Sequence, residues 1–379
     1  MVLYVFLLAL IFVLPCISLI PQDRLKVTVV RALTYLVILF LALAVGLRGQ
    51  VDADYLNYLD MYHRAPMFDL GLSFDDYSHI HGDILYLYVN SIFKSLNLDF
   101  SSLLLVVALV SLFLKYSIAS KYVRNVNLSM ALYLSFAYFL VEFIQIRWGL
   151  AISFSAASIY YLSKNKYVVS SLCMFIGGFI QSLSFIVLPF LILYFFLRRN
   201  LAKSKLFLQL CVFYIPLILA AISFISGGSI LFNIIFAIYP TLENAIVSSK
   251  YYEAGGASVT LTLYYIFQYY GAVFVIFTSR NENYNIYDDE MMKSLIYFLS
   301  YIASAQFFFL FSSIVSQRIN GLLVFVLSVA LIRVFEISRS KNSLYHMSFY
   351  FLMLLFNLYM TYNNVFKPGA LRDYSVFFI

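Results

Sequence analysis

Residues 140–151 read LVEFIQIRWGLA and join two strongly apolar runs, Met130–Leu140 and Ala151–Leu162. Together the two runs and this junction provide roughly two membrane crossings of about 20 residues each. Glu142 and Arg147 therefore lie where one expected crossing ends and the next begins. Charged groups at such a depth are costly to desolvate, so they are usually paired, hydrated by a cavity or functional. We expect Arg147 to line an extracytoplasmic site that holds an anionic group.

The composition is that of a membrane protein. The 379 residues are 63% hydrophobic and 11% charged, a bias that soluble globular domains do not show. Backbone polar groups within a bilayer must be satisfied inside helices, so we expect an all-α polytopic fold. The net charge of +7 reflects cytoplasmic loops and does not indicate a nucleic-acid partner. Cys16, Cys173 and Cys211 lie in apolar runs, which disfavours disulfides and metal ligation.

About 12 transmembrane helices are expected, as one integral membrane domain of residues 1–379. The segments are 2–20, 27–46, 101–119, 129–145, 147–163, 168–181, 183–198, 206–225, 258–278, 291–315, 318–336 and 344–362. Loops rich in lysine and arginine should face the cytoplasm, among them the loop to which we assign Lys115. Residues 47–100 and 226–257 are then extracytoplasmic loops. Ile84–Leu96 is too short to span comfortably, so it is expected to be a short interfacial helix on the outer face.

The second expected crossing is followed by RGQVDADYLNY, which begins at Arg48. Asp52 and Asp54 can cap the next helix, or one of them can accept a proton from a substrate hydroxyl. Tyr55 and Tyr58 share a face at helical spacing. They are candidates for binding substrate, and anchoring at the membrane interface explains them equally well.

Glu142 and Arg147 are five residues apart, whereas side chains on one helix meet at spacings of three and four. We therefore expect a corner or a broken helix between them. One interpretation is a salt bridge that pins this corner. In the other, Arg147 binds pyrophosphate through forked, charge-assisted hydrogen bonds. Arg318 is expected in an equivalent place, at the outer start of a helix, where backbone N–H groups also favour anions.

His79 and His81 have a spacing compatible with a metal pair, but a clear third ligand is missing, so we expect no metal site. His79 stays a candidate general base, as do three carboxylates. Residues 226–257 are long enough to form a lid. The full set of candidate bases is Asp52, Asp54, Glu142 and His79. The remaining candidates for binding substrate are Gln181, Gln317 and Tyr362.

Three short motifs carry a resemblance to a known family. They are Arg48–Gly49 followed by Asp52, Asp54, Tyr55 and Tyr58; Arg147 with Ala151 and Tyr160–Leu162 before Lys164; and Ser316–Ile319. With these motifs the chain resembles, from about residue 40 to residue 370, the EpsG-like members of the Wzy polysaccharide polymerases, which include bacterial O-antigen polymerases.

The resemblance implies a GT-C-like helical fold and a glycosyltransferase that needs no cofactor. A growing glycan on undecaprenyl pyrophosphate would be transferred to a lipid-linked repeat unit at the periplasmic face of the bacterial inner membrane. Arg147 and Arg318, with Arg48, would stabilise the departing pyrophosphate. The partners are then the lipid-linked oligosaccharide and membrane lipid, and a chain-length regulator is a further candidate partner.

Two alternative functions stay open. A flippase or exporter of lipid-linked oligosaccharides would need charges near the membrane midplane, and the sequence offers few. An O-antigen ligase would join the finished glycan to its final acceptor. The sugars, their linkage and the stereochemical course also stay open.

Overall fold

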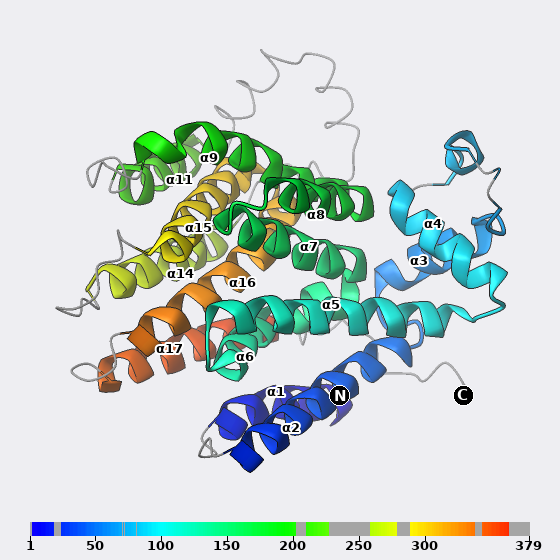
Figure 1. Ribbon diagram of the computed structural model, residues 1–379, viewed down its shortest axis with the longest axis horizontal. Helices are drawn as coiled ribbons and strands as arrows, with labels where there is room; N and C mark the ends of the chain where they lie inside the picture. Colours follow the sequence, from blue (N-terminus) through cyan, green and yellow to red (C-terminus); the bar gives the residue numbers. More distant parts are fainter. Residues whose placement is uncertain are drawn as a thin grey trace. The chain divides into compact units, whose positions relative to one another are not determined.

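The computed structural model describes residues 2–18, 24–69, 71, 73–80, 82–201, 210–226, 258–278, 289–337 and 343–363. Helices and their connections make up this part of the chain, and it contains no β-strand (Figure 1). The all-α prediction is therefore confirmed. The expected lid lies outside the described residues from position 227 onward, and so does His81.

Six of the described helices are long and apolar enough to cross a membrane. They cover Val27–Gly46, Phe100–Tyr122, Val126–Ile144, Val259–Thr278, Glu290–Phe311 and Ser313–Ile337. Four further apolar helices are shorter. Each of the twelve expected segments overlaps a helix, which confirms a helical, membrane-embedded protein, whereas helix length and hydropathy support six of the twelve crossings.

The chain divides into two compact units, each described here by itself. The first comprises Met1–Pro189 and Ser348–Ile379. Its α-helices are α1 (Val2–Ser18), α2 (Arg24–Gly46), α3 (Ala53–Arg64), α4 (Ile84–Ser95), α5 (Phe100–Tyr122), α6 (Val126–Ala137), α7 (Ile146–Ser163), α8 (Tyr167–Ile180) and most of α17 (Ser343–Thr361). The shorter turns are η1 (Asp75–Tyr77), η2 (Tyr138–Ile144) and η3 (Ser182–Val187).

Helix α7 packs between α5 and α8 through small residues. Ser153 donates to the Ser111 carbonyl oxygen of α5 (3.0 Å), and Ser158 lies 3.1 Å from the Ser170 hydroxyl of α8. In a membrane, small residues let helix backbones approach closely, and interhelical hydrogen bonds add stability. The position of α7 is thus set from both sides.

A corner precedes α7, as the spacing of Glu142 and Arg147 predicts. Helix α6 passes into the π-helical turn η2, which ends at Ile144, and Gln145 leaves the helical region with φ −97° and ψ 55°. Helix α7 begins one residue later, so Arg147 is in its first turn. Single π-turns often mark functional places in a helix.

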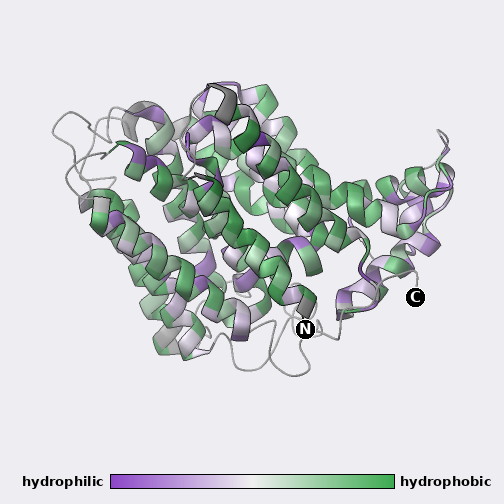
Figure 2. Ribbon diagram, turned by 90° about the horizontal axis from the view of Figure 1, so that it is seen from below, coloured by the Kyte–Doolittle hydropathy of each residue, from purple (hydrophilic) through white to green (hydrophobic). Residues whose placement is uncertain are grey.

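Residues 47–100 fold into two short helices rather than a loop with one. The expected helix is present as α4, and α3 precedes it because Asp52 caps its first turn: the carboxylate accepts from the N–H of Tyr55 at 2.9 Å. In Figure 2 most of the helical ribbon is hydrophobic, while hydrophilic colour gathers over this segment at the right. Helix α3, with Asp54, Asp60 and Arg64, supplies much of this polar character.

Two placements made from the sequence are wrong. Lys115 does not belong to a cytoplasmic loop: it lies inside α5 and is fully buried, because the Glu142 carboxylate is 2.9 Å from its ammonium group. Arg318 is not at the start of its helix. Helix α16 (Ser313–Ile337) begins earlier, where the Ser312 hydroxyl accepts from the N–H of Val315 at 3.4 Å, so Arg318 is in the second turn.

The second unit comprises Phe190–Met347, and several helices occur among its described residues. They are α11 (Ile215–Ser226), α14 (Val259–Thr278), α15 (Glu290–Phe308) and α16, with most of α9 (Leu188–Leu201) beside them in the chain. Asp289 caps α15 and pairs with Arg333 of α16 at 2.6 Å. Further along, Gln306 of α15 donates to Asn320 of α16 at 3.0 Å. These contacts fix α15 against α16 at two levels.

The close approach of helices α2 and α5 leads to a prediction about stability. A Cβ atom added at Gly46 would lie 2.6 Å from the Leu105 Cβ and 3.0 Å from its Cα. We expect Gly46→Ala to lower the free energy of unfolding by about 1–3 kcal/mol, because backbone must move to relieve overpacking. Denaturant titration in detergent measures this. Gly71→Ala is the control, since its Cβ would meet only the Asp69 carboxylate at 3.8 Å; equal midpoints for both variants would contradict the prediction.

Candidate functional site

Arg147 lies against two neighbouring tyrosine rings at the start of α7. Its guanidinium carbon lies 5.3 Å from the Tyr58 ring centroid and 5.5 Å from that of Tyr86. Its Nη1 is 3.2 Å from the Asp83 carboxylate, and 13% of the side chain is exposed. Cation–π contacts strengthen when the cation is desolvated, so a largely buried guanidinium is well stabilised here.

Asp83 connects Arg147 to a second corner of the chain. One carboxylate oxygen contacts Arg147, and the other accepts from the N–H of Ser182 at 2.9 Å. Asp83 occupies the N-cap position of α4, yet its side chain does not cap that helix. It is turned toward Ser182, which directly follows Gln181 at the end of α8. The chain next to Gln181 therefore adjoins the Arg147 pair, and substrate binding by Gln181 stays a prediction.

Arg48 and Asp52 form a buried ion pair on the same side of the unit. Nη1 of Arg48 is 3.1 Å from the Asp52 carboxylate, and the two side chains are 0% and 2% exposed. The Arg48 guanidinium also lies 5.0 Å from the Phe143 ring centroid, and none of its nitrogens makes a well-aligned hydrogen bond to the described residues. Burial raises the pKa of the Asp52 carboxyl, while the Arg48 charge and the Tyr55 N–H act in the opposite direction.

The tyrosines stay neutral phenols. Tyr58 of α3 and Tyr86 of α4 pack edge-to-face with centroids 6.0 Å apart. Burial raises the pKa of both hydroxyls, and the charges of Arg147 and Arg48 reduce that rise. A neutral phenol can donate a hydrogen bond to an anion. Tyr55 is buried against Phe100 at 5.3 Å, which makes it part of the packing under the site.

The candidate bases differ in how their side chains are engaged. The Asp54 side chain is half-buried and interacts electrostatically with Tyr58, and its carboxylate makes no hydrogen bond or ion pair with the described residues. Asp52 is engaged by Arg48 and the Tyr55 N–H. Glu142 is buried with Lys115, Tyr133 and Ser111. His79 is exposed in the turn after η1. Asp54 is thus the carboxylate most open to a substrate hydroxyl.

Three other predicted site residues belong to α16 and to the chain directly after α17. Gln317 and Arg318 are half-buried on α16 and belong to the second unit. Tyr362, at the end of α17, is 62% exposed. No group of three or more metal-ligating side chains occurs among the described residues.

Sequence reasoning missed Asp83 and Tyr86 as members of the site. A signal for both is present in the chain, because Asp83 directly precedes an apolar helix and Tyr86 lies in its first turn. What the sequence lacks is any indication that this turn meets Arg147, which is 64 residues away. The assembled group combines the Arg147 guanidinium and the Asp83 carboxylate with two aromatic rings, and Arg147 is its member that can bind an anion.

The buried Arg48–Asp52 ion pair leads to a second stability prediction. Asp52→Asn keeps a capping side chain but leaves the buried Arg48 charge uncompensated, so we expect a loss of about 3–5 kcal/mol in the free energy of unfolding. Asp60→Asn is the matched control on the same helix: its pair with Arg64 is more than half exposed and is worth at most about 1 kcal/mol. Denaturation of both purified variants measures the difference, and equal losses would contradict the prediction.

The model of the EpsG family matches residues 31–372. No curated protein and no solved structure matches the chain. The residues of the Arg147 site all lie within the matched range, which covers nearly the whole sequence. The chain belongs to the EpsG family, which is associated with Wzy-type polysaccharide polymerases.

Proposed function

We propose that this protein is a membrane glycosyltransferase that polymerises lipid-linked repeat units of a bacterial surface polysaccharide. The donor is a growing glycan on undecaprenyl pyrophosphate, and the acceptor is a repeat unit on the same lipid. The reaction takes place at the periplasmic face of the inner membrane. Membership of the EpsG family supports the reaction class, and the Arg147 group supports the chemistry.

The proposal rests on one observation: the ion pair of Arg147 and Asp83 is largely buried but still partly exposed to solvent. Among the described ion pairs of the first unit, Arg48–Asp52 and Lys115–Glu142 have side chains at most 2% exposed and Arg64–Asp60 is a surface pair, whereas Arg147 and Asp83 are 13% and 17% exposed. A guanidinium that is desolvated yet reachable binds a phosphate group bidentately. In our proposal a diphosphate replaces Asp83 at Arg147, and Tyr58 and Tyr86 donate to its oxygens.

The bonds and electrons of the proposed transfer are all accounted for without a metal ion. The acceptor hydroxyl oxygen forms a bond to the anomeric carbon of the donor sugar, and the bond from that carbon to the pyrophosphate oxygen breaks. The electron pair leaves with the pyrophosphate, whose charge Arg147 stabilises as it develops. The hydroxyl proton passes to a general base. Arg318 of the second unit and the buried Arg48 are proposed to add positive charge.

Asp54 is our proposed base. It is half-buried, and no described residue engages its carboxylate. It lies at the N-terminus of α3, one turn before Tyr58, so it is on the element that borders Arg147. Gln181, Gln317 and Tyr362 are proposed contacts for the sugars, because amide and phenol groups both donate and accept hydrogen bonds.

A flippase is the second candidate, since the Lys115–Glu142 pair puts charge inside two candidate membrane spans. That pair is closed to solvent, which favours a structural use. Loss of a flippase would remove surface glycan entirely, whereas loss of the polymerase leaves glycans of one repeat unit. Loss of a ligase would leave polymer that is unattached to its acceptor.

We expect Arg147→Lys to lower polymerisation at least tenfold, because a lysine keeps the charge and loses the fork that holds two phosphate oxygens. Arg147→Ala should lower it about 100- to 1000-fold. The measurement is conversion of a purified lipid-linked repeat unit to polymer in proteoliposomes. Arg64→Lys, on an exposed pair of α3, is the control. Wild-type rates for Arg147→Ala would remove Arg147 from the reaction.

Asp54→Asn should lower turnover by about 100-fold or more, since a general base contributes on the order of 10²–10⁴. Protein amount should stay at the wild-type level because no described contact is lost. The same proteoliposome assay reads the rate. Asp76→Asn is the control, an exposed carboxylate whose pKa is lowered by hydrogen bonds from Ser73. Normal turnover of the Asp54→Asn variant would show that another group is the general base.

A further inference from the structure

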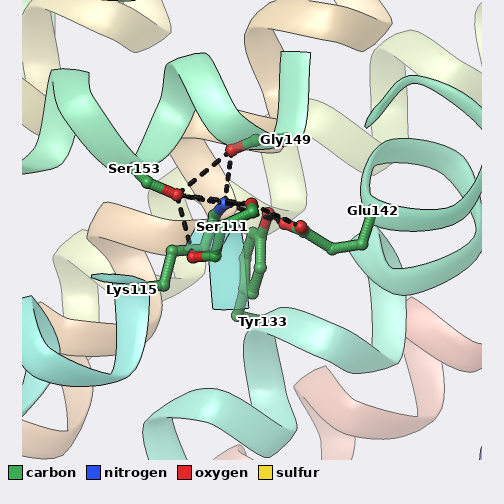
Figure 3. Close-up of polar contacts among 6 residues, drawn as sticks. All are labelled: Ser111, Lys115, Tyr133, Glu142, Gly149 and Ser153. Carbon is green, nitrogen blue, oxygen red and sulfur yellow. Dashed lines mark hydrogen bonds and ion pairs between the residues drawn. The ribbon is translucent and has the colours of Figure 1, made fainter. Parts of the chain in front are cut away.

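A closed network of charged and hydroxyl groups lies beneath the corner that carries Arg147 (Figure 3). Lys115 Nζ is 2.9 Å from one oxygen of Glu142, and both side chains are at most 1% exposed. The Tyr133 hydroxyl donates to the same carboxylate oxygen at 2.6 Å, and the Ser111 hydroxyl donates to the other at 2.7 Å. The Glu142 carboxylate is therefore satisfied from α5 and α6 at once.

Lys115 also attaches α7 to this network. Its ammonium group donates to the Ser153 hydroxyl at 2.7 Å and to the Gly149 carbonyl oxygen. Figure 3 shows these side chains and the Gly149 carbonyl converging on the lysine nitrogen. An ammonium group has three protons, so the acceptors around Lys115 meet its full donor capacity. No charge in the network is left for a substrate.

The network holds the chain on both sides of the corner. Glu142 belongs to η2, before the break at Gln145, and Gly149 belongs to the first turn of α7, after it. The N–H of Gly149 donates to the Gln145 carbonyl oxygen at 3.0 Å. Arg147 lies between these two anchored points. Its direction is therefore tied to the positions of Glu142 and Gly149.

Glycine at position 149 allows this approach. A Cβ atom there would lie 2.9 Å from a Glu142 carboxylate oxygen and 3.2 Å from the Val141 carbonyl oxygen. The carboxylate thus packs directly on the backbone of the α7 first turn, and any larger residue would displace it. Buried ion pairs are poor stabilisers compared with well-packed apolar residues, so stability alone does not explain a charged pair here.

We infer that the Lys115–Glu142 network is a positioning device that aims Arg147 at the diphosphate, with Gly149 as its contact to α7. This inference rests on the proposed polymerase function. Displacement of a binding group by about 1 Å can cost on the order of 100-fold in rate. Lys115 and Glu142 act through Arg147 and make no contact with substrate themselves.

The test is a double-mutant cycle with Arg147. Lys115→Met alone or Glu142→Gln alone would leave one buried group without its partner. The test therefore uses the combined variant Lys115→Met/Glu142→Gln. In this variant the amide oxygen at position 142 still accepts a hydrogen bond from Tyr133 or Ser111. We expect it to fold with a wild-type thermal midpoint and to lower turnover of the lipid-linked repeat unit about 10- to 100-fold. In the Arg147→Lys background the same two changes should lower turnover less than about twofold, because this variant has no guanidinium for the network to position.

Ser158→Ala is the control: it removes another buried polar contact of α7, to Ser170, away from the corner. It should change turnover less than about twofold. If the combined variant does not fold, Gly149→Ala enters the same cycle, since it displaces the Glu142 carboxylate without removing charge. An equal loss in both backgrounds, or no loss in either, overturns the positioning role. Absence of polymerisation by the wild-type protein overturns the proposed function instead.

Discussion

A guanidinium group withdrawn from water must find compensation, and the pairing of Arg147 with Asp83 is the contact that assembles the site. It draws the start of α4 and the end of α8 to the first turn of α7. Tyr58 and Tyr86, whose ring centroids are 6.0 Å apart, then contact the cation as neighbours. These groups come from α3, the start of α4, α7 and the turn after α8, so the site exists only when the first unit is folded.

The charged pairs of the first unit have different roles because they differ in exposure. Lys115–Glu142 and Arg48–Asp52 are closed, and each is reinforced by further donors or by aromatic rings. Arg147–Asp83 is partly open. In a low dielectric an ion pair is expensive to break unless another anion replaces the lost partner. This is why a diphosphate, rather than a neutral sugar, is the ligand that we assign to Arg147.

Sequence patterns predicted the local features well. Apolar runs located the helices, Asp52 was one of two candidate caps, and the spacing of Glu142 and Arg147 indicated the corner at Gln145. The errors concern contacts between distant segments. A count of basic residues assigns Lys115 to a loop, since nothing near it in the chain shows that Glu142 will meet it inside the membrane span. The role of Asp83 was likewise missed, because its partners come from α7 and η3.

The central claim is that Arg147 exchanges Asp83 for a diphosphate, and an experimental structure with a bound polyprenyl diphosphate tests it most directly. The account predicts phosphate oxygens within about 3 Å of the Arg147 guanidinium, next to the hydroxyls of Tyr58 and Tyr86, with the Asp83 contact broken. A diphosphate bound elsewhere while Arg147 keeps its contact with Asp83 would contradict the account.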